Sequence, residues 1–268
     1  MSDLKGMNDV VGLQGIFTDA LSQLKIKDFV LGFGQESFVR GNFQLPDFSD
    51  SLAQNLTQFF SDAYVNLEDL KAIVMPDGVD PISLDPSIEM NNYLAVSNLT
   101  ITGYDQDFDF TFDEFKSDLG ALTLPGPMNF LMDSGSIKIT PSDDVTSKLF
   151  INDFHLGKVL SEEVLGNISG SIQPIVEISN NGDVEFKLNR SNITNVGFND
   201  YIISQIDIVE GSFKNNLLKA GIKINDENLI ADVSCEVFIG NRQQINGQLN
   251  VQMANLDALN FTSDSSIV

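Results

Sequence analysis

The sequence predicts a mainly β protein, built as a long antiparallel meander sheet with a few short helices. Residues 245 to 253 alternate strictly between apolar or small positions and the amides of Asn and Gln. This period of two is typical of a strand with one dry face and one wet face. The C-terminal half also leaves no room between strands for the helices that a parallel sheet requires, so neighbouring strands are expected to be antiparallel.

Period two recurs along the chain before that segment. Each of these segments places apolar side chains on every second residue and turn-forming or polar residues on either side. The apolar positions are Phe29, Leu31, Phe33; Phe108, Phe110, Phe112; Val184, Phe186, Leu188; Leu218, Ala220, Ile222, Ile224; and Leu229, Ala231, Val233, Cys235, Val237, Ile239. These segments are predicted to be strands of the same meander.

Short polar segments separate the predicted strands of the second half. Residues 180–183, 225–228 and 240–242 are rich in Asn, Asp and Gly, which accept the positive φ angles of tight hairpin turns. The sequence therefore predicts a hairpin at each of these positions.

Helix is expected at two places only. Asn66 can cap a short helix over residues 67–74, with Asp69 at its third position, and a second short helix is expected over residues 156–165. Residues 50–64 fit either a helical stripe or a strand. The prolines within residues 75–92 predict an irregular excursion.

Charge and composition exclude several classes of function. The chain of 268 residues has 15 Lys and Arg against 38 Asp and Glu, a formal net charge of −23. Nucleic acid is therefore not an expected partner, and an anionic membrane surface is not one by charge. The single cysteine, Cys235, lies in an apolar register and is expected to be a small core residue.

The beginning of the chain lacks the apolar stretch of a signal peptide, and no run approaches the roughly 18 apolar residues of a membrane span. The chain is either cytoplasmic or a piece of a longer exported protein.

No motif predicts catalysis, a cofactor or a metal. His155 is the only histidine, and no G-x-S-x-G motif presents a nucleophile to it. One His and one Cys cannot form the usual zinc site. Residues 105–109 begin like a calcium loop, but Phe110 and Lys116 stand where that loop needs Gly and Glu, so a strand is predicted there instead. The chain is expected not to be an enzyme.

Several short motifs resemble, in order, those of one family. Residues 154–160, Phe-His-Leu-Gly-Lys-Val-Leu, resemble its F-D-L-G-K-L-L, and the following Leu165-Gly166-Asn167-Ile168 resembles its L-G-K-V. The weaker matches lie at residues 24–29, 38–47, 66–71, 99–104, 117–120, 196–201, 211–213 and 254–261.

These motifs are similar to those of the TamB/AsmA-like family of bridge-like lipid-transfer proteins, in the form found in Bacteroidota. Two features depart from the family pattern. His155 replaces an Asp, and residues 121–127, with Pro125 and Pro127, are expected to break for a turn where the family continues in strand. The resemblance extends from residue 24 to residue 261.

The resemblance implies that residues 1–268 are a single continuous segment, cut from a much longer chain, whose sheet curves into an open apolar groove (a β-taco). It implies a periplasmic location, an inner-membrane anchor outside this chain, phospholipid acyl chains as cargo, and an outer-membrane barrel partner of the TamA/BamA type. The implied role is phospholipid transport to, and assembly of, the outer membrane. The residues expected to line the groove are Phe29, Leu31, Phe33, Phe108, Phe110, Phe112, Leu218, Ile222, Ile224, Val233, Val237, Ile245, Leu249, Val251 and Met253.

One-sided strands fit a closed β-sandwich as well as an open groove. The alternative function is therefore a β-sandwich module for binding or adhesion, which would recognise protein or glycan through its loops.

Overall fold

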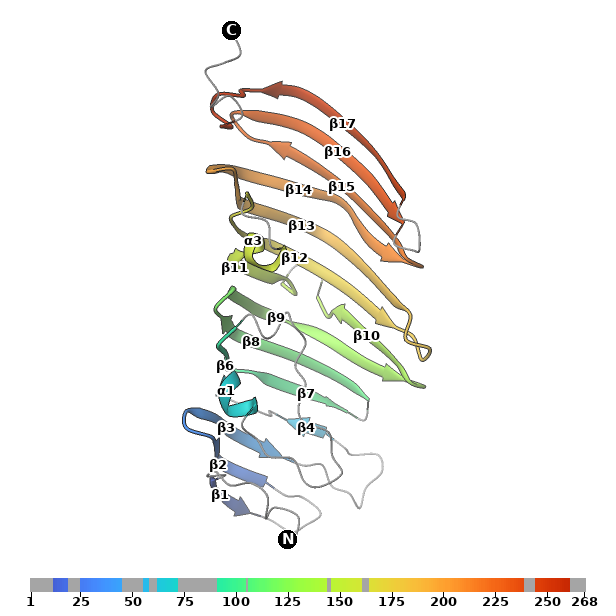
Figure 1. Ribbon diagram of the computed structural model, residues 1–268. Coiled ribbons are helices and arrows are strands. Elements are labelled where there is room, and N and C mark those ends of the chain that lie inside the picture. Colours follow the sequence, from blue (N-terminus) through green and yellow to red (C-terminus); the bar gives the residue numbers. More distant parts are fainter. Residues whose placement is uncertain are drawn as a thin grey trace. The chain divides into compact units, whose positions relative to one another are not determined.

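The computed structural model describes residues 12–18, 25–44, 55–57, 62–71, 91–104, 106–143, 146–160, 164–238 and 244–260. These residues form 17 strands and two helices of five residues each (Figure 1). Every strand pairing whose register is defined is antiparallel. The predicted mainly β, antiparallel fold is confirmed. The chain divides into two compact units, Met1–Pro127 and Met128–Val268. The expectation of one continuous groove over residues 1–268 stays a prediction.

The first unit is a short-stranded meander. Its elements are β1 (Gly12–Thr18), β2 (Lys25–Phe33), β3 (Ser37–Gln44), β4 (Asn55–Thr57), β5 (Asp62–Asn66), α1 (Leu67–Lys71), β6 (Tyr93–Ser97), β7 (Thr100–Tyr104) and β8 (Asp107–Ser117). Pairing runs β1–β2–β3–β5–β6–β8, while β4 pairs with β7 and β7 also pairs with β8. Where the ambiguous residues 50–64 are described, at 55–57 and 62–64, they are strand. Most of the expected excursion over residues 75–92 lies outside the described residues.

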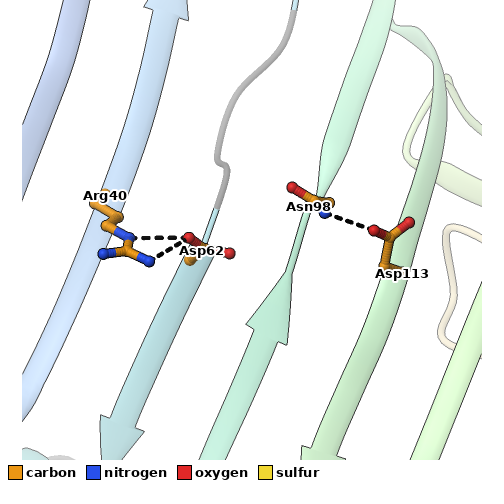
Figure 2. A network of polar contacts seen from close by, with 4 residues as sticks. All are labelled: Arg40, Asp62, Asn98 and Asp113. Carbon is orange, nitrogen blue, oxygen red and sulfur yellow. Dashed lines mark hydrogen bonds and ion pairs between the residues drawn. The ribbon is translucent and has the colours of Figure 1, made fainter.

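Polar contacts between strands hold the register of this unit. Arg40 of β3 stands directly opposite Asp62 of β5 and donates to its Oδ2 atom from Nε at 2.9 Å and from a terminal nitrogen at 2.8 Å (Figure 2). Asn98, between β6 and β7, donates from Nδ2 to Asp113 of β8 at 2.5 Å. Because a one-residue slip would separate both pairs, these contacts favour the observed register.

Helix α1 is held against the β2–β3 turn by the carboxylate of Asp69. The backbone N–H groups of Gln35, Glu36 and Ser37 donate to it at 2.9, 3.0 and 3.0 Å, and the Ser37 hydroxyl donates at 2.7 Å. The predicted cap is confirmed, since Asn66 Oδ1 accepts from the N–H of Glu68 at 3.0 Å. The sequence reading placed Asp69 within the helix but missed this long-range contact.

Strand β9 (Gly120–Asp133) corrects one expectation. A proline turn was predicted over residues 121–127, but the strand continues through Pro125 and Pro127 without a break. Leu124 and Gly126 are buried while Pro125 is exposed, which is the alternation of an ordinary strand. The φ of proline is compatible with extended backbone, and proline removes only its own hydrogen-bond donor.

The second unit is a sheet of longer strands. Its further elements are β10 (Ser136–Pro141), β11 (Leu149–His155), α3 (Leu156–Leu160), β12 (Asn167–Ile178), β13 (Val184–Phe198), β14 (Tyr201–Lys214), β15 (Leu217–Asn225), β16 (Leu229–Phe238) and β17 (Gln244–Ala254). Residues 128–133 of β9 pair with β10. Strands β10 and β11 pair with opposite halves of β12, and the strands from β12 to β17 then follow in chain order.

Tight turns connect these strands. The predicted hairpins at residues 180–183 and 225–228 are confirmed, while residues 240–242 lie outside the described part of the chain. Three further connections have only two residues, both at positive φ: Ser134–Gly135, Asn199–Asp200 and Asn215–Asn216. This conformation matches the twist of antiparallel strands, and asparagine adopts it more readily than most residues.

The second helix is shorter than predicted. It spans Leu156–Leu160 instead of residues 156–165, and residues 161–163 lie outside the described part. Leu165 forms a bridge with Phe198 of β13, so its backbone joins the sheet. His155 is the last residue of β11, directly before the helix.

A polar network fixes one end of strands β14 to β16. Asp226 is buried in the β15–β16 turn and accepts from the Tyr201 hydroxyl, from the Ser204 N–H at 2.9 Å and hydroxyl at 2.8 Å, and from the Asn228 N–H at 3.0 Å. Asn199 and Asn260 exchange side-chain to backbone hydrogen bonds at 3.0 Å. These contacts hold residues 255–260 against the same end of the sheet.

The hydrogen-bonded carboxylates of Asp69 and Asp226 predict that the folded protein loses stability in acid. Hydrogen bonds from the N–H of Gln35, and also from Glu36 and Ser37, lower the pKa of Asp69 to about 2. Burial opposes ionisation of Asp226, but its hydrogen bonds from Tyr201, Asn228 and Ser204 outweigh that effect and lower its pKa to about 2. Both values lie below the ordinary 3.8, so the unfolded chain takes up protons at higher pH than the folded one. The stabilisation is expected to be complete above about pH 4 and to decline progressively toward pH 2.

Urea titrations at several pH values measure this loss. In the variant Asp226→Asn the decline below about pH 4 should be shallower, because one of the two carboxylates no longer titrates. An acid transition unchanged by that substitution would contradict the assignment.

Candidate functional site

Strand register places the apolar side chains of the second unit on one face of its sheet. Residues directly opposite each other in an antiparallel pair project to the same side. One row of such partners crosses eight successive strands, from β9 through β10 and β12 to β17. Its members are Phe130, Ile139, Val176, Phe186, Phe213, Leu218, Val237 and Ile245.

Further rows complete this surface, which we call the apolar face. One consists of Ile208, Ile222, Val233 and Leu249, and another of Ile193, Ile206, Ile224, Ala231 and Val251. Between the row of eight and the row of Leu249 lies a row of small residues: Gly211, Ala220, Cys235 and Gly247. All members of these rows are uncharged.

The apolar face is open to solvent at its β17 end. The exposed fractions are 75% for Ile245, 67% for Leu249 and 47% for Val251. Large apolar side chains that are exposed together indicate a binding surface more often than isolated ones do. The expectation that Cys235 is a core residue is only partly met, because it lies on the apolar face and is half-buried.

The opposite face of the same strands is charged. Lys219 of β15 pairs with Glu236 of β16 at 2.8 Å. Glu185 of β13 contacts Lys214 of β14 at 2.7 Å and Lys187 at 3.2 Å, and these hydrogen bonds hold the pKa of Glu185 below its ordinary value. There are also two shallow depressions, of about 290 and 240 Å³. The lining of the first includes Lys219 and Glu236 but also the small residues Ala220, Cys235 and Gly247, and the lining of the second includes Glu185 and Lys187 but also Ile175. The sheet therefore has one charged side and one uncharged, apolar side.

The expected groove residues separate into several groups. Leu218, Ile222, Ile224, Val233, Val237, Ile245, Leu249 and Val251 lie together on the apolar face. Met253 stands opposite Ile230, because the register between β16 and β17 shifts there. Ile230 itself is not a member of the apolar rows, since the residue next to it in the chain, Ala231, is the one that lies on the apolar face. The shift takes Met253 out of the rows described above.

Six of the residues expected to line the groove belong to the first unit, and all six are half-buried: Phe29, Leu31, Phe33, Phe108, Phe110 and Phe112. Leu31 belongs to a row that crosses β2, β3, β5, β6 and β8. The row consists of Leu31, Val39, Ala63, Val96 and Phe115. Phe108 and Phe110 lie opposite Gly103 and Ile101 of β7. The first unit thus also has an apolar row of its own.

Sequence reasoning missed part of the apolar face. Phe130, Ile139, Val176 and Phe213 were not expected to contribute, although each extends the row of eight. Their strands carry prolines or bulges: the register of β14 against β15 shifts between Ile208 and Glu210, which interrupts period two. Only the strand pairing shows that apolar residues on either side of such an irregularity share a face.

The residues that bear on catalysis and metal binding can be placed in the described part of the chain. Within them, no three His, Cys, Asp or Glu side chains are grouped to hold a metal ion. His155 is exposed at the end of β11. No helix in the described part is long and apolar enough to cross a membrane. The expectation that the chain is not an enzyme stays a prediction.

Comparison with known proteins adds no assignment. No protein-family model matches the chain, and neither the curated proteins nor the solved structures include a significant match.

Proposed function

We propose that the apolar face of the second unit binds lipid acyl chains, as part of a TamB/AsmA-like, bridge-like lipid-transfer protein. The observation that carries this proposal is that a strongly acidic chain has several rows of apolar side chains on one face of its sheet. Members of these rows are open to solvent, with exposed fractions of 75% for Ile245 and 67% for Leu249. A soluble protein that keeps such side chains in water gains free energy when an apolar ligand covers them.

The uncharged surface favours the hydrocarbon part of a lipid over its head group. Burying an alkyl chain contributes roughly 0.8 kcal/mol per CH₂ group, and it requires no specific polar partner. An alkyl chain lying along the row of Gly211, Ala220, Cys235 and Gly247 would contact larger apolar side chains on both sides. Because the rows cross successive strands and consist of uncharged residues, an alkyl chain that moves along a row passes from strand to strand without meeting a charged side chain of that row.

The wider role rests on the resemblance of the sequence motifs. It would place the chain in the periplasm, connect it to the inner membrane through an anchor elsewhere in the protein, and pair it with an outer-membrane barrel of the TamA/BamA type. In that setting the face would support phospholipid transport to the outer membrane.

The alternative, a closed β-sandwich used for binding or adhesion, would bury the inward side of every strand in a dry core. The exposure of Ile245, Leu249 and Val251 supports the open face over this alternative.

A matched pair of substitutions on β17 tests the proposal. Leu249→Asp places a carboxylate on the apolar face, whereas Asn250→Asp places one on the opposite side of the same strand. Both positions are exposed, so both variants should fold with nearly unchanged stability. We expect Leu249→Asp to weaken binding of a fluorescent fatty acid roughly tenfold, because an alkyl chain that passes the carboxylate must displace its hydration water.

Binding is measured by fluorescence titration, with native mass spectrometry of the gently purified chain to detect bound phospholipid. Asn250→Asp should bind like the unsubstituted chain. If neither assay detects lipid, or if both variants bind equally well, the apolar face is not a lipid site. If Leu249→Asp unfolds the protein, the closed sandwich is the better description.

A further inference from the structure

Three aromatic rings stack across neighbouring strands of the first unit. Phe38 of β3 and Tyr64 of β5 stand directly opposite each other, with ring centroids 6.3 Å apart and ring planes inclined by 22°. Tyr93 of β6 continues the stack at 5.6 Å from Tyr64, with an inclination of 16°. Phe38 precedes Val39 in the chain, so the stack lies on the side of the sheet opposite the apolar row that contains Leu31 and Val39. We call this side the polar face of the first unit.

At the Phe38 end of the stack, a ring, a cation and a carboxylate already meet. The guanidinium carbon of Arg40 lies over the ring of Phe38, 5.5 Å from its centroid. The same guanidinium donates to Oδ2 of Asp62, at 2.9 Å from Nε and 2.8 Å from a terminal nitrogen (Figure 2). The π electrons of a ring attract a guanidinium, and a carboxylate binds it through charge and hydrogen bonds. The chain itself therefore fills this end with an arginine.

At the Tyr93 end, the ring and the carboxylate are present without a cation from the described residues. Ala95 of β6 pairs with Lys116 of β8, so the same register brings Tyr93 level with Asp118. Asn92 donates to Oδ2 of Asp118 from its backbone nitrogen at 2.6 Å and from Nδ2 at 2.7 Å, which fixes the carboxylate beside β6. Lys116 is exposed on the same face, but no ion pair joins it to Asp118. Within the described part of the chain, this end matches the Phe38 end except for the arginine.

Negative charge surrounds the stack. Burial raises the pKa of the Tyr64 hydroxyl above its ordinary value of 10.0, and nearby acidic groups raise it further, with Glu36 first and Asp118 among the others. Glu36 is exposed, and the chain as a whole has a formal charge of −23. This field attracts basic proteins in general, and the Tyr93 end adds a ring on which one of their cations can stack.

We propose that the Tyr93 end of the stack binds an arginine side chain of a basic partner protein, with its guanidinium over the ring of Tyr93 and against the carboxylate of Asp118. The partner's arginine would repeat there what Arg40 does at the Phe38 end. Arginine fits better than lysine, because the planar guanidinium stacks on a ring and presents several donors to a carboxylate at once. The site belongs to the polar face of the first unit, so it does not depend on lipid binding by the second.

Two fluorescently labelled peptides, tetra-arginine and tetra-lysine, separate this site from general attraction. They carry the same charge, so the acidic chain attracts both alike, and added salt screens both alike. Only the arginine peptide can stack a guanidinium on Tyr93. In anisotropy titrations of the full chain at physiological ionic strength, tetra-arginine should bind roughly fivefold more tightly than tetra-lysine.

Two substitutions locate the site. Tyr93→Leu and Asp118→Asn should each reduce the preference for tetra-arginine to less than about twofold, because each removes one of the two groups that hold the guanidinium. Asp118→Asn keeps the ring stack and an acceptor oxygen, so it remains informative if thermal melting shows that Tyr93→Leu does not fold.

Two controls match the lost groups. Phe115→Leu removes a ring from the opposite side of the same sheet, and Glu177→Gln removes an exposed carboxylate from the second unit. Both should keep the roughly fivefold preference for tetra-arginine. Equal binding of the two peptides by the unsubstituted chain would overturn the proposal. So would a preference that survives Asp118→Asn, or one that the controls lose to the same extent.

Discussion

Replacement of Asp226 by alanine is expected to lower the free energy of unfolding by roughly 3 kcal/mol. The buried carboxylate accepts hydrogen bonds from the Tyr201 hydroxyl, from the N–H and hydroxyl of Ser204, and from the N–H of Asn228. Alanine leaves these donors without their acceptor, at the point where β14, β15 and β16 are held together. Urea unfolding followed by circular dichroism measures the loss.

The neighbouring residue provides the control. Glu227 is exposed in the same turn, so Glu227→Ala should change the stability by less than about 0.5 kcal/mol. Hydrogen exchange should show the strongest loss of protection in Asp226→Ala near residues 199–204 and 226–230. If the two alanine variants are equally stable, the Asp226 network does not hold this end of the sheet.

Replacement of Gly34 by alanine should have a comparable effect in the first unit, again roughly 3 kcal/mol. Gly34 has a φ of +63°, which is unfavourable for any residue with a Cβ atom. The added Cβ would also lie 2.2 Å from Cγ of Asp69, so the carboxylate would have to leave the N–H groups of Gln35, Glu36 and Ser37.

Gly182→Ala separates the two contributions. Gly182 also has a positive φ, +86°, but a Cβ there would meet nothing within 4 Å. The free energy of unfolding of Gly182→Ala should therefore fall by only about 1 kcal/mol, which is the cost of placing a residue with a Cβ atom at positive φ. Equal losses in Gly34→Ala and Gly182→Ala would show that the Asp69 contact contributes little to stability.

Prediction from the sequence was most successful where one strand is regular. Strand β16 and most of β17 follow period two, and their apolar residues share a face as expected. The proline-containing strand β9 was misread as a turn, because proline signals a break on average but fits extended backbone. The second helix was predicted too long, because the sequence pattern alone could not show that Leu165 joins the sheet.

The sequence by itself determined the class of fold, the hairpin turns at residues 180–183 and 225–228, and the alternation of apolar and polar sides along the regular strands, because these depend on residues close together in the chain. The tertiary structure decided which apolar residues form one surface. Phe130, Phe186 and Ile245 belong to one row only because seven strand pairings place them in register, across bulges that local periodicity cannot follow. It also decided that Asp69 and Asp226 are buried acceptors, since their donors include residues that lie more than twenty positions away in the chain and are brought near only by folding.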